Sequence, residues 1–332
     1  MNILSLFDGI SMARVALDKA NIPVNMYLAS EVDKYAIQVS KKNYSDIMHL
    51  GDVRYIKKLK VPIDLLIGGF PCQSHSIAGN GMGFDDPRGQ LFFDVVRLIN
   101  TIKPRYYILE NVASMKKNTQ KEISWILGVD PVMLDSALVS AQSRKRLFWI
   151  GKLNDKGIYE KVEIEQPIDR GIKLSDILLD DTYTEYIKSY PLTASYNGVV
   201  LWNSISKCQR TMVWNKPIRV DTLGKGGQGE RVYSIDGKSV CLSANGGGKG
   251  AKTGLYAIKD YARKLHPIEC ERLMGVVDNY TNGISDTQRY KCLGNGFHVD
   301  IITHILNQVF NPNGYNGKDG LEYQNDIRKE WD

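Results

Sequence analysis

The chain has 332 residues, 43% of them hydrophobic and 9% aromatic, which is enough for a substantial core in one large or two modest domains. Its five cysteines are an odd number without a C-x-x-C pair, which disfavours a disulfide framework or a zinc cluster and favours a reducing, cytosolic setting. No segment approaches the roughly 18 apolar residues that a membrane span needs, and no charged leader precedes the first strand-like run. We therefore expect a cytoplasmic protein with neither a membrane anchor nor a metal centre.

The net charge of +6 is concentrated in one segment. Between residues 200 and 260 there are ten basic and four acidic residues, whereas the rest of the chain has 33 of each. A local positive field suits a polyanionic partner, but a solvated basic face gives the same pattern. Charge alone therefore leaves a nucleic acid partner and an ordinary solvated surface equally open.

The region up to about residue 154 alternates short β-rich runs with helical periods, which indicates βαβ units and a mostly parallel sheet. We expect strands at Ile3–Phe7, Met26–Ser30, Asp64–Gly68, Tyr106–Glu110 and Arg146–Ile150. We expect helices at Met12–Ala20, Asp33–Asn43 and Gln90–Ile102. The predicted fold class is α/β, a doubly wound Rossmann-like sheet.

Past about residue 161 the chain changes to short, turn-punctuated segments rich in Gly, Thr and Lys. Two stretches, 222–233 and 241–256, look alike: each has a glycine-rich loop and an aliphatic residue followed by tyrosine, which hints at a repeated strand-loop unit. A helical pattern resumes from about Ala262 and ends in an apolar stripe formed by Val299, Ile302, Leu306 and Val309. We therefore expect a first domain at 1–160, a smaller irregular β-rich domain at 161–261, a return to the first domain at 262–310 and a flexible tail at 311–332.

The turn Phe7-Asp8-Gly9-Ile10-Ser11 directly follows the first strand, at the sheet edge where parallel sheets bind ligands. It lacks the full G-x-G-x-x-G pattern, which weakens the case for a dinucleotide. Glu31 follows the second strand, 22 residues after Gly9, where a carboxylate can accept hydrogen bonds from ribose hydroxyls. The pair indicates a nucleoside cofactor, with an ordinary surface carboxylate as an equal alternative for Glu31.

Cys72 lies in a loop after an apolar strand, a Gly-Gly turn and Pro71. A structural cysteine usually lies within an apolar stripe, whereas a loop cysteine can be an activated thiolate. Glu110 ends the next strand and lies on the same sheet edge. Gln142, Arg144 and Arg146 alternate into a further strand and should project to one side, although a solvated basic turn is the simpler interpretation of that cluster.

Five short motifs occur in the order and rough spacing of one enzyme family: Phe-Asp-Gly at 7–9, Gly-Phe-Pro-Cys-Gln at 69–73, Glu-Asn-Val at 110–112, Gln-x-Arg-x-Arg at 142–146 and Leu-Gly-Asn at 293–295. On these motifs the chain resembles the DNA (cytosine-5) methyltransferases. The Pro-Cys-Gln and Gln-x-Arg-x-Arg forms look bacterial or phage-like, while residues 109–149 look like the vertebrate de novo branch. The likeness covers 1–155 and 262–310, and it is only general in between, as in that family's variable target-recognition domain.

The resemblance implies that the sheet is a methyltransferase sheet and that the chain transfers methyl from S-adenosylmethionine to C5 of a cytosine flipped out of a specific duplex DNA sequence. Addition of a Cys72 thiolate at C6 would make the ring nucleophilic enough to attack the methyl group. Glu110 would face N3 as a carboxylic acid, and Arg144 would lie at O2 with Arg146 as a supporting partner.

The resemblance also implies binding roles. Phe7 would pack on the adenine, Glu31 would bind the ribose, Asp52 the adenine amine, and Asn295 would close the pocket. The expected cofactor-binding set is Phe7, Asp8, Gly9, Ile10, Glu31, Val32, Asp52, Val53, Pro71, Leu91, Asn295 and Val299. The expected DNA-binding set is Gln73, Ser76, Gln142, Arg219, Lys225, Gln228, Arg231, Lys249 and Lys252. The partners implied are double-stranded DNA and, in a bacterial or phage-infected cell, a cognate restriction endonuclease.

Three positions depart from the family pattern. His75 stands where an aromatic residue is usual, Ser11 replaces the second glycine of the cofactor turn, and Gly296-Phe297 replaces the common Ser-Val. The serine is tolerable because no pyrophosphate has to approach the turn. The changes at 75 and 296–297 leave the packing around Cys72 and the contacts near the donor sulfonium open.

Three other functions are alternatives to DNA methylation. An RNA methyltransferase acting on transfer RNA would share the fold, but its Cys-Phe-Thr signature is absent and the long glycine-rich segment favours duplex DNA. A catalytically dead binding module would be free to lose Cys72, Glu110, Arg144 and Arg146, all of which are present. A nicotinamide dehydrogenase is disfavoured by the incomplete glycine pattern.

Overall fold

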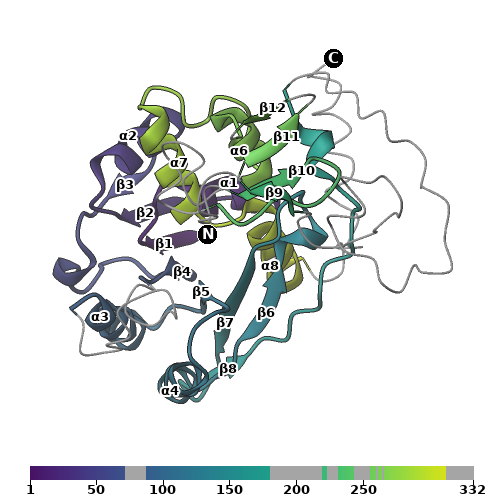
Figure 1. Cartoon of the computed structure of the whole chain (residues 1–332). Coiled ribbons are helices and arrows are strands. Elements are labelled where there is room, and N and C mark those ends of the chain that lie inside the picture. The colour runs from purple at the N-terminus through teal and green to yellow at the C-terminus, as the bar shows by residue number, and fades with distance from the viewer. Residues whose placement is uncertain are drawn as a thin grey trace, which may run out of the picture. The chain divides into compact units, whose positions relative to one another are not determined.

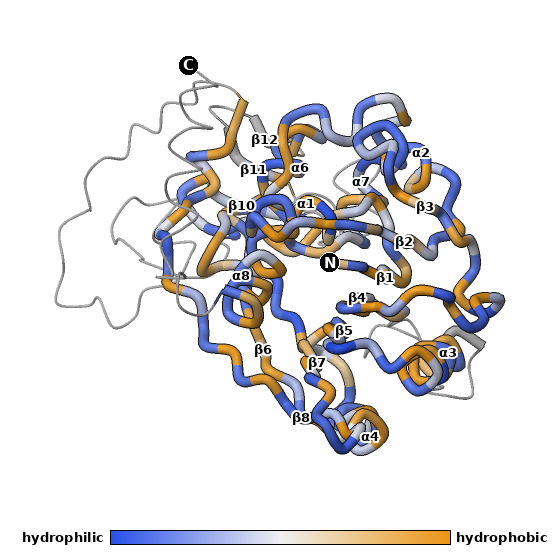
Figure 2. Tube along the Cα trace, turned by 180° about the vertical axis from the view of Figure 1, so that it is seen from behind, coloured by the Kyte–Doolittle hydropathy of each residue, from blue (hydrophilic) through white to orange (hydrophobic). Residues whose placement is uncertain are grey.

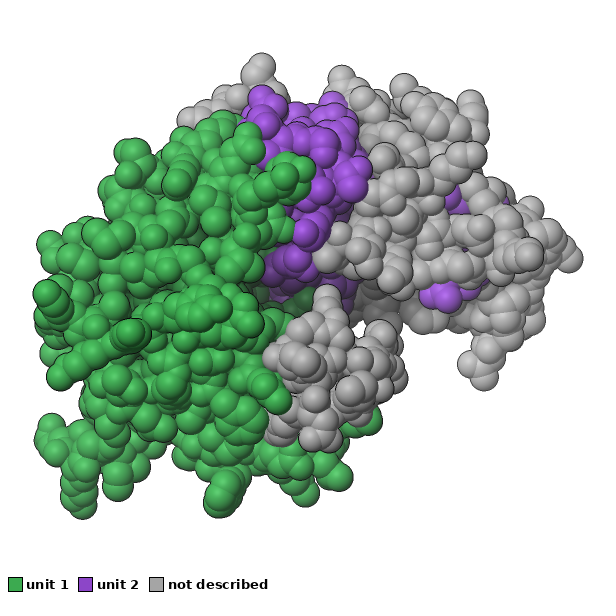
Figure 3. Space-filling view, turned by 90° about the vertical axis from the view of Figure 1, so that its left-hand side faces the viewer, with its two compact units in different colours: residues 1–135, 145–168, 296–332 green, residues 136–144, 169–295 purple. Residues whose placement is uncertain are grey.

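The computed structural model describes residues 1–71, 87–179, 219–222, 231–242, 255–258, 261–263 and 265–311. The chain divides into two compact units, coloured green and purple in Figure 3. Unit 1 comprises Met1–Asp135, Lys145–Ile168 and Gly296–Asp332, and unit 2 comprises Ser136–Arg144 and Asp169–Asn295. Helices α6 and α7 belong to unit 2 and helix α8 to unit 1. The predicted division into domains, with a return to the first domain at 262–310, stays a prediction.

Unit 1 is built on one sheet with the strand order β3-β2-β1-β4-β5-β7-β6 (Figure 1). The strands are β1 (Asn2–Leu6), β2 (Met26–Ser30), β3 (Met48–His49), β4 (Leu65–Gly69), β5 (Tyr106–Val112), β6 (Val132–Asp135) and β7 (Lys145–Leu153), with β8 (Tyr159–Lys161) paired to β7. Strands β1 to β5 pair in parallel, and β7 runs antiparallel to both β5 and β6. This confirms the predicted α/β class with a mostly parallel sheet.

The helices of unit 1 are α1 (Met12–Lys19), α2 (Lys34–Asn43), α3 (Pro87–Ile102), α4 (Lys117–Leu127) and α8 (Val299–Phe310), with a short 3-10 turn η1 (Val53–Tyr55) after β3. The five expected strands and three expected helices are all present, with ends that differ by at most three residues. Helix α4 and strands β3, β6 and β8 were not predicted.

The core of unit 1 covers both faces of the sheet. On one face Leu4, Leu66 and Leu109 pack in a cluster with buried residues of α3 and α4. The alternate strand residues Ile3 and Ile67 are also no more than 1% exposed, and Figure 2 shows β4 and α3 as largely hydrophobic. Burial on both faces is the pattern of a doubly wound parallel sheet.

The strand order reverses between β1 and β4. From β1 the chain proceeds outward through β2 and β3, and it then returns to β4 on the other side of β1. Ligands of open parallel sheets bind at such a switch point, beyond the carboxyl ends of the strands. The turn after β1 and the segment after β4 therefore flank the expected binding crevice.

Gly151 in β7 gives a direct test of the packing of this sheet. A Cβ at this position would lie 2.5 Å from the ring of Tyr107, its cross-strand partner, and that ring is fully buried. We expect Gly151→Ala to lower the free energy of unfolding by about 1–3 kcal/mol because the core is overpacked. Urea denaturation measures the change. In a Tyr107→Ala background the same alanine should cost nothing, and an equal cost in both backgrounds would refute this packing.

Unit 2 contains a four-stranded sheet with the order β12-β11-β10-β9. Its strands are β9 (Arg219–Thr222), β10 (Arg231–Ser234), β11 (Leu255–Ile258) and β12 (Tyr261–Arg263). The two look-alike stretches form the neighbouring strands β10 and β11, and their equivalent residues pair in register, Val232 with Leu255 and Tyr233 with Tyr256. The repeated unit inferred from the sequence is thus a pair of adjacent strands.

The other described elements of unit 2 are η3 (Ser136–Leu138), η4 (Leu174–Ile177), α6 (Pro267–Met274) and α7 (Asp286–Asn295). The expected return to helix at Ala262 is wrong, because that residue lies in β12 and α6 begins at Pro267. The start of α6 is fixed by His266, whose Nδ1 accepts a hydrogen bond from the Ile268 amide and whose own amide donates to Glu269. Among the described residues, no helix is long and apolar enough to cross a membrane.

Candidate active site

The turn after β1 is held by a buried carboxylate. Asp8 Oδ1 accepts a hydrogen bond from the Tyr27 hydroxyl at 2.7 Å, and Oδ2 accepts one from Ser11 Oγ at 2.5 Å. Phe7, Gly9 and Ser11 all have left-handed backbone conformations, with φ of 54°, 61° and 63°. Such a conformation costs a non-glycine residue about 1–2 kcal/mol, so the hydrogen bonds must hold the turn in place. Asp8 is only 4% exposed and supports the turn from inside.

Glu31 ties this turn to the start of α2. Its Oε2 accepts from the Gly9 amide at 2.8 Å, and its Oε1 accepts from the amides of Val32 at 2.7 Å and Asp33 at 2.8 Å. A carboxylate has about four lone-pair sites, so acceptor capacity remains for a hydroxyl group. Val32 beside it is 69% exposed and presents an apolar surface. Glu31 is therefore a positioned acceptor at the carboxyl end of β2.

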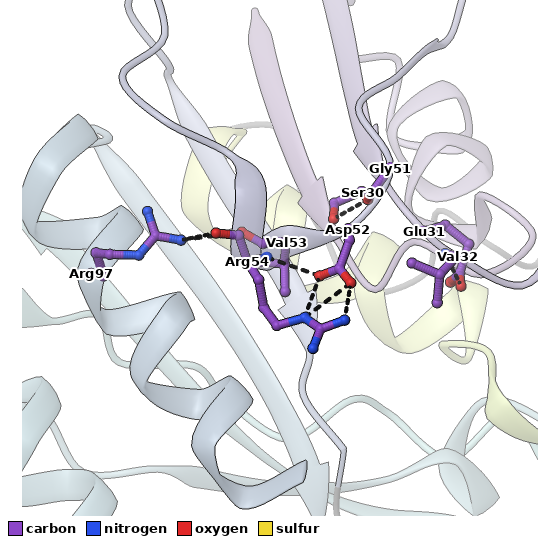
Figure 4. A network of polar contacts seen from close by, with 8 residues as sticks. All are labelled: Ser30, Glu31, Val32, Gly51, Asp52, Val53, Arg54 and Arg97. Carbon is purple, nitrogen blue, oxygen red and sulfur yellow. Dashed lines mark hydrogen bonds and ion pairs between the residues drawn. The ribbon is translucent and has the colours of Figure 1, made fainter. Parts of the chain in front are cut away.

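Asp52 caps the 3-10 turn after β3 (Figure 4). Its carboxylate accepts from the Arg54 amide and from the Arg54 guanidinium, and these hydrogen bonds lower the pKa of Asp52 below its usual value. Arg97 of α3 donates to the carbonyl oxygens of Val53 and Ile56, at 3.2 Å and 2.8 Å. Asp52 is thus an ionised acceptor on a turn anchored from a neighbouring helix.

The remaining residues of the expected cofactor-binding set differ in how far they are buried. Ile10, Val53 and Val299 are no more than 4% exposed, so their predicted cofactor contacts stay predictions. Leu91 is partly buried against the core cluster. Pro71 is partly exposed after β4.

Glu110 and Arg146 form an ion pair between β5 and β7. The Arg146 Nε lies 2.7 Å from Glu110 Oε1, and the two side chains are 16% and 15% exposed. The pair lies at the end of β4, because a Cβ at Gly69 would be 3.1 Å from Glu110 Oε2 and 3.2 Å from the Phe297 ring. Gly69 therefore leaves the space that the Glu110 carboxylate and Phe297 occupy.

Asn111 connects β5 to the segment that leads to Cys72. Its buried side-chain amide donates to the Phe70 carbonyl at 3.2 Å. Cys72, Gln73 and Ser76 lie outside the described residues. The two residues before Cys72 are described, so the expected nucleophile follows immediately after a backbone fixed from the strand that carries Glu110.

The Gln-x-Arg-x-Arg segment differs from the expectation that its three polar side chains project together. Gln142 and Arg144 belong to unit 2 and Arg146 to unit 1. Gln142 is fully buried; its Nε2 donates to the Leu273 carbonyl and its Oε1 accepts from the Leu242 amide, so it supports unit 2, and its expected contact with DNA stays a prediction. Arg144 is 4% exposed.

Arg144 holds other parts of unit 2 through its guanidinium. It donates to Cys241 Sγ at 3.2 Å, to the Leu242 carbonyl at 3.1 Å and to the Gly294 carbonyl at 2.9 Å. Gly294 lies in the last turn of α7, directly before Asn295. Arg144 therefore ties the end of the helix that carries Asn295 to the segment around Cys241.

Of the expected DNA-binding residues in the basic segment, two are described. Arg219 on β9 is exposed and Arg231 on β10 is half-buried. Lys225, Gln228, Lys249 and Lys252 lie outside the described residues. Among the described residues, no group of three or more histidine, cysteine or acidic side chains could hold a metal ion.

Several side chains that build the site are not among the residues predicted from the sequence. Tyr27, Arg97 and Asn111 support Asp8, the Asp52 turn and the Cys72 segment, respectively. Asn111 could have been found in the Glu-Asn-Val motif, and Phe297 was noted only as a departure from the family pattern. Tyr27 and Arg97 carry no local signal because their partners are distant in sequence.

The buried Asp8 predicts a pH-dependent contribution to stability. Burial raises the pKa of Asp8 above its ordinary 3.8, against the hydrogen bonds from Ser11 and Tyr27. A raised folded-state pKa means that the stabilising contribution is present at low pH and is lost as pH rises through the folded pKa. Asp8→Asn removes this titration, so its stability relative to wild type should improve as pH rises from about 4 to 7. Urea denaturation at several pH values measures this, and a constant difference would contradict it.

Fold and site define a class: a doubly wound sheet that presents Glu31 and Asp52 after two of its parallel strands and the Glu110–Arg146 pair between β5 and β7. A family model for C-5 cytosine-specific DNA methylase matches residues 1–311. The chain belongs to this family, and its activity is methyl transfer to carbon 5 of cytosine in DNA.

Named relatives agree with this assignment. The Type II methyltransferase M.HhaI of Haemophilus parahaemolyticus is 34% identical over 322 residues, covering 93% of this chain and 94% of the relative. The Type II methyltransferase M1.ScrFI of Lactococcus lactis subsp. cremoris is 32% identical, covering 92% of this chain and 77% of the relative.

Solved structures show the same fold at low identity. The Entamoeba histolytica methyltransferase EhMeth superposes with a TM-score of 0.66 at 18% identity, covering 94% of this chain and 98% of the other. The S. pombe Dnmt2 methyltransferase has a TM-score of 0.62 at 16% identity, covering 95% and 100%.

Proposed function

We propose that the protein uses S-adenosylmethionine to methylate cytosine in a specific duplex DNA sequence, through a covalent adduct with Cys72. The observation that carries the proposal is the Glu110–Arg146 pair beside Gly69, at the end of the strand that leads to Cys72. This arrangement supplies a carboxylate and a cation at the end of the strand that the Cys72 segment follows in the sequence.

The chemistry assigned to these residues follows the electrons of the cytosine ring. The Cys72 thiolate adds to C6, and the displaced electron density moves toward N3 and O2 while C5 becomes nucleophilic. Glu110, once it has taken up a proton and its ion pair with Arg146 has opened toward the base, supplies that proton at N3. After C5 has taken the methyl group, water takes up the C5 proton, the thiolate leaves C6, and N3 returns its proton to Glu110, which restores the aromatic ring.

The geometry favours exchanging the two arginine roles expected from sequence. Arg146 pairs with Glu110 at 2.7 Å and is therefore the cation that we propose beside O2. The guanidinium of Arg144 donates hydrogen bonds to Cys241, Leu242 and Gly294. We propose that Arg144 acts as a support for the end of α7.

The residues at the carboxyl ends of β1 to β3 fit an adenosine group. Glu31 retains acceptor capacity for a ribose diol, and Asp52 is an ionised acceptor suited to the adenine amine. Phe7 and the exposed Val32 provide apolar surface for the base. S-adenosylmethionine, when bound here, supplies the electrophilic methyl group. The turn after β1 has no glycine pattern for a pyrophosphate, which agrees with a nucleoside cofactor.

The substrate class and setting extend the proposal. We propose that Arg219 and Arg231, with Lys225, Gln228, Lys249 and Lys252, contact the duplex, Lys and Arg mainly through phosphates. Gln73 and Ser76 would contact the DNA around the flipped cytosine. The Type II names of the relatives support a cytoplasmic enzyme with a cognate restriction endonuclease.

The experiment that tests the proposal measures transfer from S-adenosyl-[methyl-³H]methionine to duplex DNA and to transfer RNA. We expect label in DNA alone, at C5 of cytosine. Bisulfite sequencing of DNA from cells that express the protein then gives the target sequence. Label in transfer RNA alone, or none in either, would refute the proposed substrate.

A further inference from the structure

A chain of buried hydroxyl groups leads from the turn after β1 to the edge strand. Ser11 Oγ lies 2.5 Å from Asp8 Oδ2 and 2.6 Å from Ser40 Oγ of α2. Ser40 Oγ lies 3.4 Å from Nε2 of His49 in β3. Ser11 and Ser40 are both fully buried. Three separate elements of unit 1 therefore meet through two serine hydroxyls.

The proton positions along this chain follow from the carboxylate. Asp8 Oδ2 accepts a hydrogen bond from the Ser11 hydroxyl, so the Ser11 proton points toward Asp8. The Ser11 oxygen then accepts from Ser40, and Ser40 in turn can accept from His49. Ser40 is thus the group that completes the hydrogen bonding of Ser11.

Ser11 needs support because of its backbone. Its φ of 63° and ψ of 36° lie in the left-handed region, which glycine adopts freely and serine does not. Its carbonyl accepts from the amides of Arg14 and Val15 in the first turn of α1, and its amide donates to the Asp8 carbonyl. The conformation of Ser11 therefore sets how the turn Asp8–Ser11 enters the helix.

We propose that Ser40 is a positioning residue for the cofactor turn. Its hydroxyl holds Ser11 in the left-handed conformation and stands in for the glycine that this backbone would otherwise require. The inference rests on the proposed function, because the turn is assigned to the nucleoside cofactor. It adds a specific expectation: the affinity for the cofactor depends on the hydroxyl of residue 40 only when residue 11 is not glycine.

The test is a double-mutant cycle with S-adenosylmethionine binding as the readout. The variants are Ser40→Ala, Ser11→Gly and the double variant, with affinity measured by isothermal titration calorimetry. Ser40→Ala should weaken binding about fivefold, the effect of losing one buried hydrogen bond. Ser11→Gly should bind within about twofold of wild type, and adding Ser40→Ala to it should change nothing further. Ser124→Ala is the matched control, because that serine accepts a hydrogen bond from Trp149 away from the turn.

A mere packing role for Ser40 predicts a different outcome. Loss of packing would weaken binding equally in the serine and glycine backgrounds, and that result, or no loss in either, would overturn the proposal. Hydrogen exchange at the backbone amides of Gly9 and residue 11, measured by NMR in the absence of cofactor, gives an independent readout. Protection at these amides should fall in Ser40→Ala but not when Ser11→Gly is already present. If wild type fails to bind S-adenosylmethionine, the proposed function fails, while the exchange data still decide the positioning role.

Discussion

Cys72→Ala is expected to lower methyl transfer on the order of 10⁶-fold, the size of loss seen when a covalent nucleophile is removed from an enzyme. The substitution removes the only group assigned to attack C6 of cytosine, while Glu110, Arg146 and the cofactor turn stay in place. Transfer of labelled methyl to duplex DNA measures the loss, and the unfolding transition should match that of wild type.

The control is a second cysteine. Cys270 of α6 is buried in unit 2 and has no assigned part in the chemistry. Cys270→Ala should keep methyl transfer, at a small cost in stability for the lost sulfur. Substantial transfer by Cys72→Ala would remove this residue from the nucleophile role.

Glu110→Gln is expected to lower kcat by about 10²- to 10⁴-fold, the usual contribution of a positioned general acid. Glutamine keeps the size of the side chain beside Gly69 and Phe297 but cannot deliver a proton to N3, and it ends the ion pair with Arg146. The affinity for S-adenosylmethionine should stay near that of wild type, because Glu31 and Asp52 are untouched.

Glu163→Gln is the matched control for charge. Glu163 pairs with Lys161 at 2.9 Å in the same unit, but its side chain is 80% exposed. Exposed pairs contribute about 0–1 kcal/mol, so this variant should keep normal turnover. Equal turnover of Glu110→Gln and Glu163→Gln would place Glu110 outside the active site.

Much of the sheet could be predicted because its signals are local. The runs before Phe7, Glu31 and Pro71 are apolar and end in turns, so their strands were found within one residue at each end. Strand β3 has two residues and β8 three, too short for a recognisable period. Helix α4 was missed although it begins close after Glu110; the sequence analysis assigned no helical period there.

The positions of the acidic residues could be predicted, but their partners could not. Glu31 and Asp52 follow β2 and β3, and Glu110 lies two residues before the end of β5, which places all three toward one sheet edge. The ion pair of Glu110 with Arg146 depends on β7 lying antiparallel beside β5, which no local pattern reveals. The contacts of Gln142 could not be predicted for a related reason: alternation predicts a common side only within one continuous strand, and β7 begins at Lys145.

The most direct test of the covalent mechanism uses duplex DNA with 5-fluorocytosine in the mapped target site, together with S-adenosylmethionine. Fluorine at C5 cannot leave as a proton does, so the adduct cannot eliminate and the protein should stay bound to DNA through denaturing electrophoresis. Mass spectrometry should then locate the cross-link at Cys72, and Cys72→Ala should give none. Efficient methylation of ordinary DNA without any such complex, or a cross-link at another residue, would contradict the mechanism.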